Sequence, residues 1–165
     1  MKTIYLVRHA KSSWQYPDLD DFERPLNKRG RKALIIMGKV LKNLEVTPDL
    51  IMSSPATRAA ITARVIADTI NYPPHKIQYT EAIYSSDQGT LLGIIKEIND
   101  SVNKAMLIGH NPGLTDLANY ISDQRIDNIP TCGVFCVDFE IISWLEIGGH
   151  SGKLNFFEFP KKNES

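Results

Sequence analysis

The stretch Ile4-Tyr5-Leu6-Val7-Arg8-His9 contains the pattern that decides the fold: a short apolar run that ends in a basic residue. The pattern returns twice, where Leu50–Met52 leads into Arg58 and where Ala105–Ile108 leads into His110. Each run has the length and composition of a buried strand, and the second and third runs are followed by a cap residue and a proline, which suits the first position of a helix. Because ligands bind at the carboxyl ends of the strands in an open parallel sheet, we expect these arginines and histidines to meet in one crevice.

The rest of the chain alternates helices with strands. Asn27 is a candidate cap for a helix that runs to about Leu44, and two further helices are expected from Pro55 to about Ile70 and from about Gln88 to Ile98. Alternation of this kind predicts parallel strands joined by right-handed crossovers, with helices on both faces of the sheet.

The C-terminal part has a different pattern. Val134–Phe139 and Leu154–Phe159 are strand-like, and the Gly148-Gly149 turn region lies between them, which predicts antiparallel strands at one edge of the sheet. The expected fold class is therefore α/β: a three-layer α/β/α sandwich with a mainly parallel central sheet, helices on both faces and an antiparallel edge. We expect residues 1–165 to form a single domain.

Composition excludes several classes of partner. The 19 basic and 19 acidic side chains cancel, so no global field attracts a nucleic acid or a membrane surface. The apolar run at Ile4–Val7 is too short for a signal-peptide core or for a membrane span of about 20 residues, which predicts a cytoplasmic protein. Cys132 and Cys136 are expected to be reduced structural thiols. The oligomeric state stays open.

The basic residues at the strand ends suit phosphoryl transfer to nitrogen. That reaction needs a neutral imidazole aimed at phosphorus and positive donors on the equatorial oxygens. Guanidinium groups that can donate two parallel hydrogen bonds to phosphoryl oxygens come from Arg8, Arg58 and Arg24. The imidazoles come from His9 and His110, of which one can be neutral while the other is charged. A two-metal phosphatase would need several Asp and His ligands at these strand ends, and the chain offers arginine there instead. We therefore expect no metal and no cofactor.

Several motifs of the chain resemble those of a known family. The run Arg8-His9-Ala10-Lys11-Ser12 is similar to the signature of the histidine phosphatase superfamily, the phosphoglycerate mutase-like group. Further motifs resemble the small SixA-like branch of phosphohistidine phosphatases; they are Arg24-Pro25-Leu26 with Gly30, Ser53-Ser54-Pro55 with Arg58, Ala59 and Thr62, and Gly109-His110-Asn111-Pro112-Gly113. Ala10 replaces the commoner glycine of the superfamily and suits an Arg-His-Ala-Lys-Ser subgroup.

The resemblance implies a role for each matched residue. His9 would be the nucleophile that becomes phosphohistidine, Arg8 and Arg58 would bind the transferred phosphoryl group, and His110 would complete the pocket as a charged donor. Substrate binding is expected from three further residues, namely Lys11, Arg24 and Asn111.

The general acid is less clearly marked. Many superfamily members place a glutamate after the third strand, and Glu81 lies near that position. The competing acids are Asp18, Asp20 and Asp21 in the long loop that follows His9, and a further alternative is that the chain has no such acid. The candidate residues at the mouth of the site are Trp14, Tyr16, Arg24 and Tyr84.

The favoured function is a metal-independent phosphatase that acts through a phosphohistidine on His9. Its expected partner is a phosphorylated protein or a small phosphorylated metabolite, with protein phosphohistidine or a small phosphate ester as the substrate. The alternative is a non-catalytic module that binds phosphate or a phosphoprotein. Such a module would keep Arg8 and Arg58 but would have no need of His9.

Overall fold

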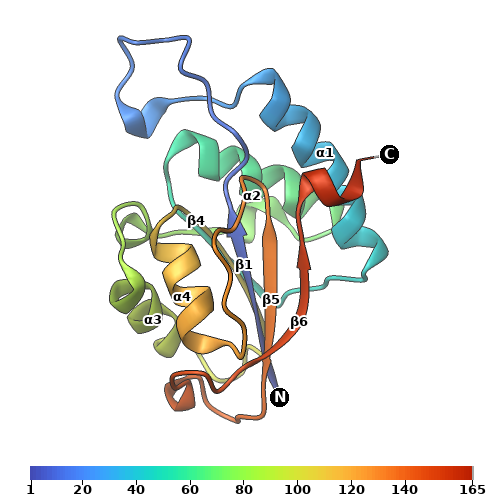
Figure 1. Cartoon of the computed structure of the whole chain (residues 1–165), viewed down its shortest axis with the longest axis vertical. Coiled ribbons are helices and arrows are strands. Elements are labelled where there is room, and N and C mark those ends of the chain that lie inside the picture. The colour runs from blue at the N-terminus through green and yellow to red at the C-terminus, as the bar shows by residue number, and fades with distance from the viewer. Residues whose placement is uncertain (165) are drawn as a thin grey trace.

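A computed structural model describes residues 1–164 of the chain and contains a central sheet of six strands (Figure 1). The strands are β1 (Lys2–Arg8), β2 (Leu50–Ser53), β3 (Gln78–Tyr79), β4 (Lys104–Gly109), β5 (Val134–Phe139) and β6 (Lys153–Glu158). Their order in the sheet is β3-β2-β4-β1-β5-β6. The pairs β1–β4, β2–β4 and β2–β3 are parallel, whereas β1–β5 and β5–β6 are antiparallel. The predicted antiparallel edge is confirmed.

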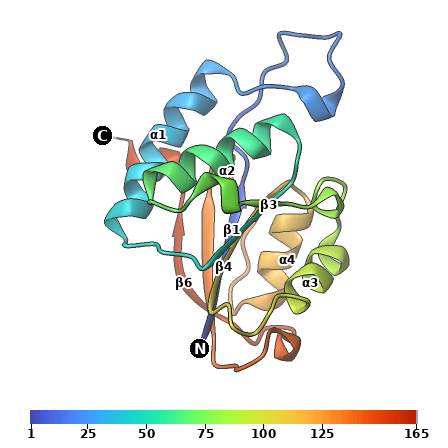
Figure 2. The ribbon, with the colours of Figure 1, turned by 180° about the vertical axis from the view of Figure 1, so that it is seen from behind.

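Helices cover both faces of this sheet. Helices α1 (Lys28–Asn43) and α2 (Thr57–Thr69) lie on one face, and α3 (Gln88–Lys96) and α4 (Gly113–Ile121) lie on the other, as the two opposite views show (Figures 1 and 2). Short 3-10 turns complete the described elements; they are η1 (Asp21–Glu23), η2 (Pro74–Lys76), η3 (Glu81–Ile83), η4 (Trp144–Glu146) and η5 (Pro160–Asn163). The predicted three-layer α/β/α architecture is confirmed.

The core is divided by the sheet into two layers. Because successive side chains of a strand point to opposite faces, Tyr5 and Val7 of β1 pack in the layer under α1 and α2, while Ile4 and Leu6 pack in the layer under α3 and α4. Burial of a strand on both faces explains its continuous apolar run, which is typical of a parallel sheet covered by helices.

The helices α1, α2 and α4 begin directly after their capping residues, and neither Pro55 nor Pro112 is the first residue of a helix. Asn27 caps α1, where its Oδ1 accepts a hydrogen bond from the Gly30 N–H at 2.7 Å, as predicted. Helix α2 begins at Thr57, two residues after Pro55, because the Ala56 carbonyl accepts the first helical hydrogen bonds. Pro112 likewise lies just outside α4, and α3 ends at Lys96, before the expected Ile98.

The strand register gathers the candidate site at one edge of the sheet. Arg8 at the end of β1 lies opposite Gly109 at the end of β4, and Ser53 of β2 lies opposite Ile108. A turn that precedes β5 closes the back of this edge, since the Cys132 N–H donates to the carbonyls of both Arg8 and His9 at 3.0 Å. Cys132 adopts a left-handed conformation (φ 62°) outside β5, and both cysteines are free and buried.

Within residues 1–164, no helix is long and apolar enough to cross a membrane.

Candidate active site

His9 is buried directly after β1 and its ring has one free nitrogen. Its Nδ1 lies 2.7 Å from the Ala10 carbonyl oxygen, which can only accept a hydrogen bond, so Nδ1 carries the hydrogen. Burial, together with the positive charges of Arg58, Arg8 and Arg24, lowers the pKa of His9 to about 4 against the opposing effect of the Ala10 carbonyl. The imidazole is therefore neutral at pH 7 and presents the lone pair of Nε2, as a nucleophile requires.

His110 follows β4 and lies beside His9, with 5.0 Å between the ring centroids. Its Nε2 is 2.7 Å from the Ser54 hydroxyl oxygen, and a Ser54 hydroxyl that donates to Nε2 leaves the hydrogen on Nδ1. Burial, the repulsion that a protonated His9 would exert, and the positive charges of Arg58 and Arg8 together lower the pKa of His110 to about 3, against an opposing effect of the Asp21 carboxylate. The ring is neutral here, in contrast to the charged donor that we expected. A phosphoryl dianion beside the ring would raise this pKa, because an anion favours the charged form.

Two buried side-chain nitrogens at this site have no hydrogen-bond partner. Among the residues that the structure describes, Arg8 Nε and His110 Nδ1 are the buried side-chain nitrogens without a hydrogen-bond partner. The Arg8 guanidinium is otherwise fixed, since Nη1 donates to the Ile129 carbonyl at 3.0 Å. An unpaired buried donor costs about 1–3 kcal/mol, so two of them at one site indicate a place where an acceptor binds.

Arg58, in the first turn of α2, is held by Asp21 of η1. Its Nη1 donates to the Asp21 carbonyl at 2.6 Å and its Nη2 donates to Asp21 Oδ2 at 2.9 Å. The Tyr84 hydroxyl also donates to Oδ2, at 2.7 Å, and the Tyr84 ring packs edge-on against His110 with 5.5 Å between centroids. The hydrogen bond from Tyr84, followed by those from Arg58 and Arg24, holds the pKa of Asp21 well below its usual range. These hydrogen bonds favour the ionised carboxylate, which weighs against Asp21 as the general acid.

Arg24 is buried and braces the loop that follows His9. Its three donor nitrogens bond to the Ser13 carbonyl, the Ser12 hydroxyl and Asp21 Oδ1 at 3.0, 2.6 and 3.0 Å. The exposed Trp14 ring stacks on the guanidinium at 3.2 Å. These bonds give Arg24 a role in loop structure, and its expected role in substrate binding stays a prediction.

Thr62 joins the end of β1 to α2. Its hydroxyl accepts a hydrogen bond from the Ala10 N–H at 2.9 Å and donates to the Arg58 carbonyl at 2.8 Å. Ala10 follows the nucleophile candidate and Arg58 lies one helical turn before Thr62, so this residue fixes the two segments relative to each other. The spacing of four residues in a helix was the signal that could have identified Thr62 as a positioning residue.

The structure places three expected site residues away from the four central ones. The Asn111 amide donates to Asn128 and to the Ile129 carbonyl, and its oxygen accepts from Thr115, so its side chain is already fully engaged. It therefore braces the turn after β4, and a contribution of Asn111 to substrate binding, which we expected from its side chain or its backbone, stays a prediction for the backbone N–H. Lys11 is exposed and lines a neighbouring groove. Glu81 is exposed at the start of η3, and its role as general acid stays a prediction.

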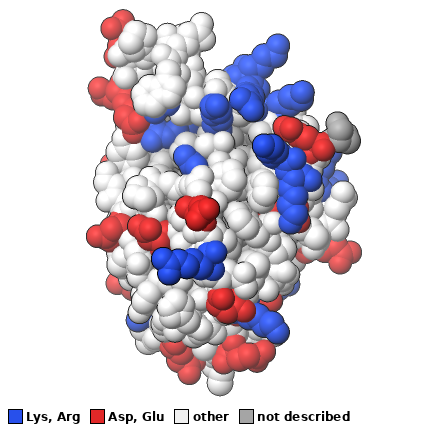
Figure 3. Space-filling model, in the orientation of Figure 1, with Lys and Arg blue, Asp and Glu red and all other residues white. Residues whose placement is uncertain are grey.

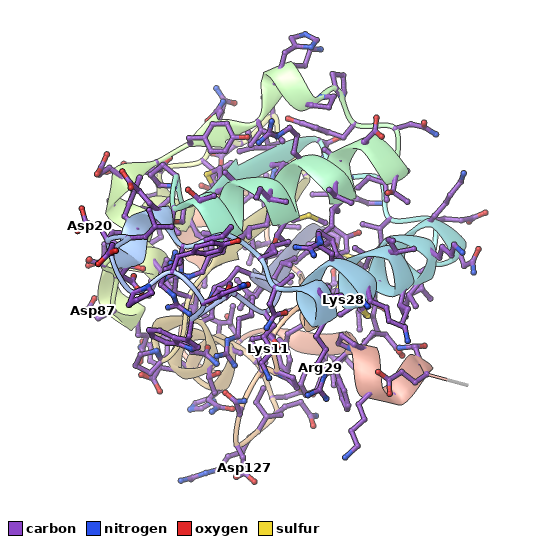
Figure 4. The ribbon with its side chains drawn as sticks, turned by 90° about the horizontal axis from the view of Figure 1, so that it is seen from above. Lys11, Asp20, Lys28, Arg29, Asp87 and Asp127 are labelled. Atoms are coloured by element: carbon purple, nitrogen blue, oxygen red, sulfur yellow. The ribbon has the colours of Figure 1, made fainter. Side chains whose placement is uncertain are left out.

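Charged side chains surround the mouth of the site. Figure 4 looks onto the carboxyl ends of the parallel strands and shows Lys11 and Arg29 on one side, with Asp20 and Asp87 on another. Among residues 1–164 there is no cluster of three or more His, Cys, Asp or Glu side chains with the geometry to hold a metal ion.

Comparison with known proteins identifies the family. Residues 4–114 match the model of the histidine phosphatase superfamily (branch 1). The protein At3g52155 of Arabidopsis thaliana, a chloroplastic protein, is 30% identical over 159 residues, which are 92% of this chain and 72% of that protein. The SixA structure from Agrobacterium tumefaciens is 27% identical with a TM-score of 0.83, covering 96% of this chain and 98% of that chain. The protein histidine phosphatase SixA in complex with tungstate has the same fold, with a TM-score of 0.83 at 19% identity and coverage of 98% and 99%.

The chain belongs to the histidine phosphatase superfamily, branch 1. Within that superfamily it is a member of the SixA-like branch, in agreement with the resemblance of its motifs, and it is a phosphatase.

Proposed function

We propose that the chain is a metal-independent phosphatase that transfers a phosphoryl group first to His9 Nε2 and then to water. The observation that carries this proposal is the pair of unpaired buried donors, Arg8 Nε and His110 Nδ1, beside a neutral His9 whose Nε2 is free. The substrate class is a protein phosphohistidine or a small phosphate ester. The name of the SixA structure, a protein histidine phosphatase, supports the first of these.

The first step forms a bond between His9 Nε2 and phosphorus. The lone pair of Nε2 attacks, the bond from phosphorus to the leaving group breaks, and the leaving group takes the electron pair. A histidine leaving group can depart already protonated, whereas an alkoxide must receive a proton from an acid. Arg8, Arg58 and His110 supply donors for the equatorial oxygens, which carry most of the charge in a loose transition state.

The second step returns the enzyme to its starting form. Water attacks phosphorus, the bond to Nε2 breaks, and the products are inorganic phosphate and neutral His9. The hydrogen bond to the Ala10 carbonyl keeps the proton on Nδ1 through both steps, so Nε2 is again the free nitrogen.

Rapid quenching with labelled substrate tests the proposal. Wild-type protein is expected to trap phosphate in an acid-labile, base-stable bond, as a phosphoramidate requires, and turnover of p-nitrophenyl phosphate is expected to continue in excess chelator. His9→Ala should lower kcat by about 10³-fold or more and should abolish the label. His75→Ala, which removes an exposed histidine outside the site, serves as the matched control.

Three results would count against this mechanism. Label that persists in His9→Ala would exclude His9 as the nucleophile, and activity that requires a restored divalent ion would exclude metal-independent chemistry. Binding of phosphate without any turnover would favour the non-catalytic binding module.

A further inference from the structure

A groove of about 440 Å³ lies beside the active site, and its lining comes from the segment after His9, the start of α1, the turn before β5 and the C-terminal turn η5. None of Arg8, His9, Arg58 and His110 lines the groove, so it is a separate feature from the phosphoryl site.

The groove is strongly basic. Lys11, Arg29, Lys32 and Lys161 are exposed and face a single carboxylate, Glu164. In the part of the chain that the structure describes, none of these four cations takes part in a salt bridge. Figure 3 shows basic side chains gathered over the start of α1 and the C-terminal turn, whereas acidic side chains gather at the tip of the loop on the other side.

Fold stability does not account for these cations. The first turn of α1 has no acidic residue, and cations near a helix N-terminus are disfavoured by the helix dipole. Arg29 therefore lies where an acidic residue would stabilise the helix more, and Lys32 lies directly after that turn. Their charge calls for another explanation, and an anionic ligand in the groove supplies one.

The groove is continuous with the active site through its walls. Lys11 follows the nucleophile candidate His9 by two residues, and Thr131 directly precedes Cys132, whose N–H bonds to the carbonyls of Arg8 and His9. The same turn supplies the Ile129 carbonyl that fixes Arg8. A ligand whose phosphoryl group lies on Arg8 thus has the groove immediately beside it.

We propose that this groove docks an acidic segment of the protein that carries the phosphohistidine. The cations match acidic side chains, and the apolar wall formed by Ile36, Pro130 and Phe159 offers contact to a peptide rather than to a compact, fully charged metabolite. On the other side of the mouth, Asp20 and Asp87 would repel an acidic partner (Figure 4). The charges around the site therefore also favour one orientation of the docked segment. This inference rests on the proposed function.

Two synthetic peptides with one phosphohistidine each serve as probes. One has Asp and Glu beside the phosphohistidine, and the other has Ser and Gly at those positions. For both peptides and for p-nitrophenyl phosphate, kcat/KM is measured with wild type, with Arg29→Glu/Lys32→Glu, and with Lys39→Glu/Lys42→Glu. The last variant is the matched control, because it reverses two exposed charges of the same helix outside the groove.

Wild type and the control are expected to prefer the acidic peptide by about tenfold at low salt, and the preference should shrink as salt screens the charges. Arg29→Glu/Lys32→Glu should lose the preference while it hydrolyses p-nitrophenyl phosphate as fast as wild type. Its melting temperature should not fall, because acidic residues suit the start of a helix.

Equal preference in the groove variant and the control, or no preference in wild type, would overturn the docking proposal alone. The same holds if p-nitrophenyl phosphate is hydrolysed and neither peptide is. Absence of phosphatase activity on all three substrates would instead refute the proposed function, and the docking proposal with it.

Discussion

Asp21 connects three side chains that reach the active site from different segments. Arg24 comes from the loop, Arg58 from α2 and Tyr84 from the turn that follows η3, and all three donate to the Asp21 carboxylate. Only two of the guanidinium nitrogens of Arg58 are engaged in this way, so its Nε and the second hydrogens on Nη1 and Nη2 are available to a phosphoryl group. We therefore expect Asp21 to position Arg58 rather than to donate a proton.

Asp21→Asn is expected to lower kcat/KM by about tenfold, the scale of one charge-assisted hydrogen bond. The loss should be the same for aryl phosphates with good and poor leaving groups, because the residue positions a phosphoryl donor. A loss that grows with the basicity of the leaving group would instead indicate a general acid. Asp68→Asn changes an exposed carboxylate of α2 that is not among the candidate acids, and should behave as wild type.

Sequence patterns predicted the four central residues but not the residues that hold them. Arg8, His9, Arg58 and His110 could be predicted together because parallel strands end at one edge of a sheet, which is a property of the whole fold. The contacts of Asp21 depend on how the loop after His9 folds back onto α2, and no local periodicity encodes that path. For the same reason the sequence did not show that Lys11 points into a groove.

Helix α1 is fixed against the segment that follows the nucleophile. Gly30 lies against the Lys11 backbone, where an added Cβ would overlap the Lys11 carbonyl, and that carbonyl also accepts a hydrogen bond from the Asn27 N–H at 3.0 Å. The absence of a side chain at Gly30 thus lets α1 approach the segment two residues after His9. The start of this helix was predictable from its cap, whereas the close approach was not.

Gly30→Ala should lower the free energy of unfolding by about 1–3 kcal/mol, the usual cost of overpacking, and should also reduce kcat because His9 shifts with Lys11. Gly93→Ala is the matched control in α3, since a Cβ there meets nothing within 4 Å. That change is expected to raise the free energy of unfolding by about 0.5–1 kcal/mol and to leave kcat unchanged. Urea unfolding and steady-state kinetics measure both quantities, and equal effects of the two substitutions would show that α1 does not hold the segment after His9.

His9, which is buried, and His110, which is half-buried, make the stability of the whole molecule depend on pH. Burial lowers the pKa of His9 to about 4 and that of His110 to about 3, from an ordinary value of 6.5. Below pH 6.5 the unfolded chain therefore binds protons that the folded protein does not, and the free energy of unfolding falls as the pH falls towards these values. The slope approaches about 1.4 kcal/mol per pH unit for each histidine, and stability is complete above pH 6.5.

Urea unfolding at pH 7, 6 and 5 measures this slope. His9→Gln and His110→Gln should each flatten it, whereas His75→Gln should leave it unchanged because His75 is exposed. The pKa of Asp21, which is held low, contributes in a separate window, since its stabilisation is lost only as the pH falls below about 3.9. A slope that is the same in all three variants would mean that neither His9 nor His110 controls acid unfolding.

Because the nitrogens of Arg8 and His110 are unpaired, we expect the free energy of unfolding to depend on the anion of the buffer. These donors come from the ends of β1 and β4, about 100 residues apart in the chain, so an anion that bridges them binds only the folded protein. Phosphate or vanadate at a hundred times its Kd should therefore add about 2.7 kcal/mol to the free energy of unfolding and raise the melting temperature relative to an amine buffer of equal ionic strength. Inorganic phosphate, the reaction product, would then act as a chemical chaperone for this enzyme and would rescue weakened variants such as Gly30→Ala.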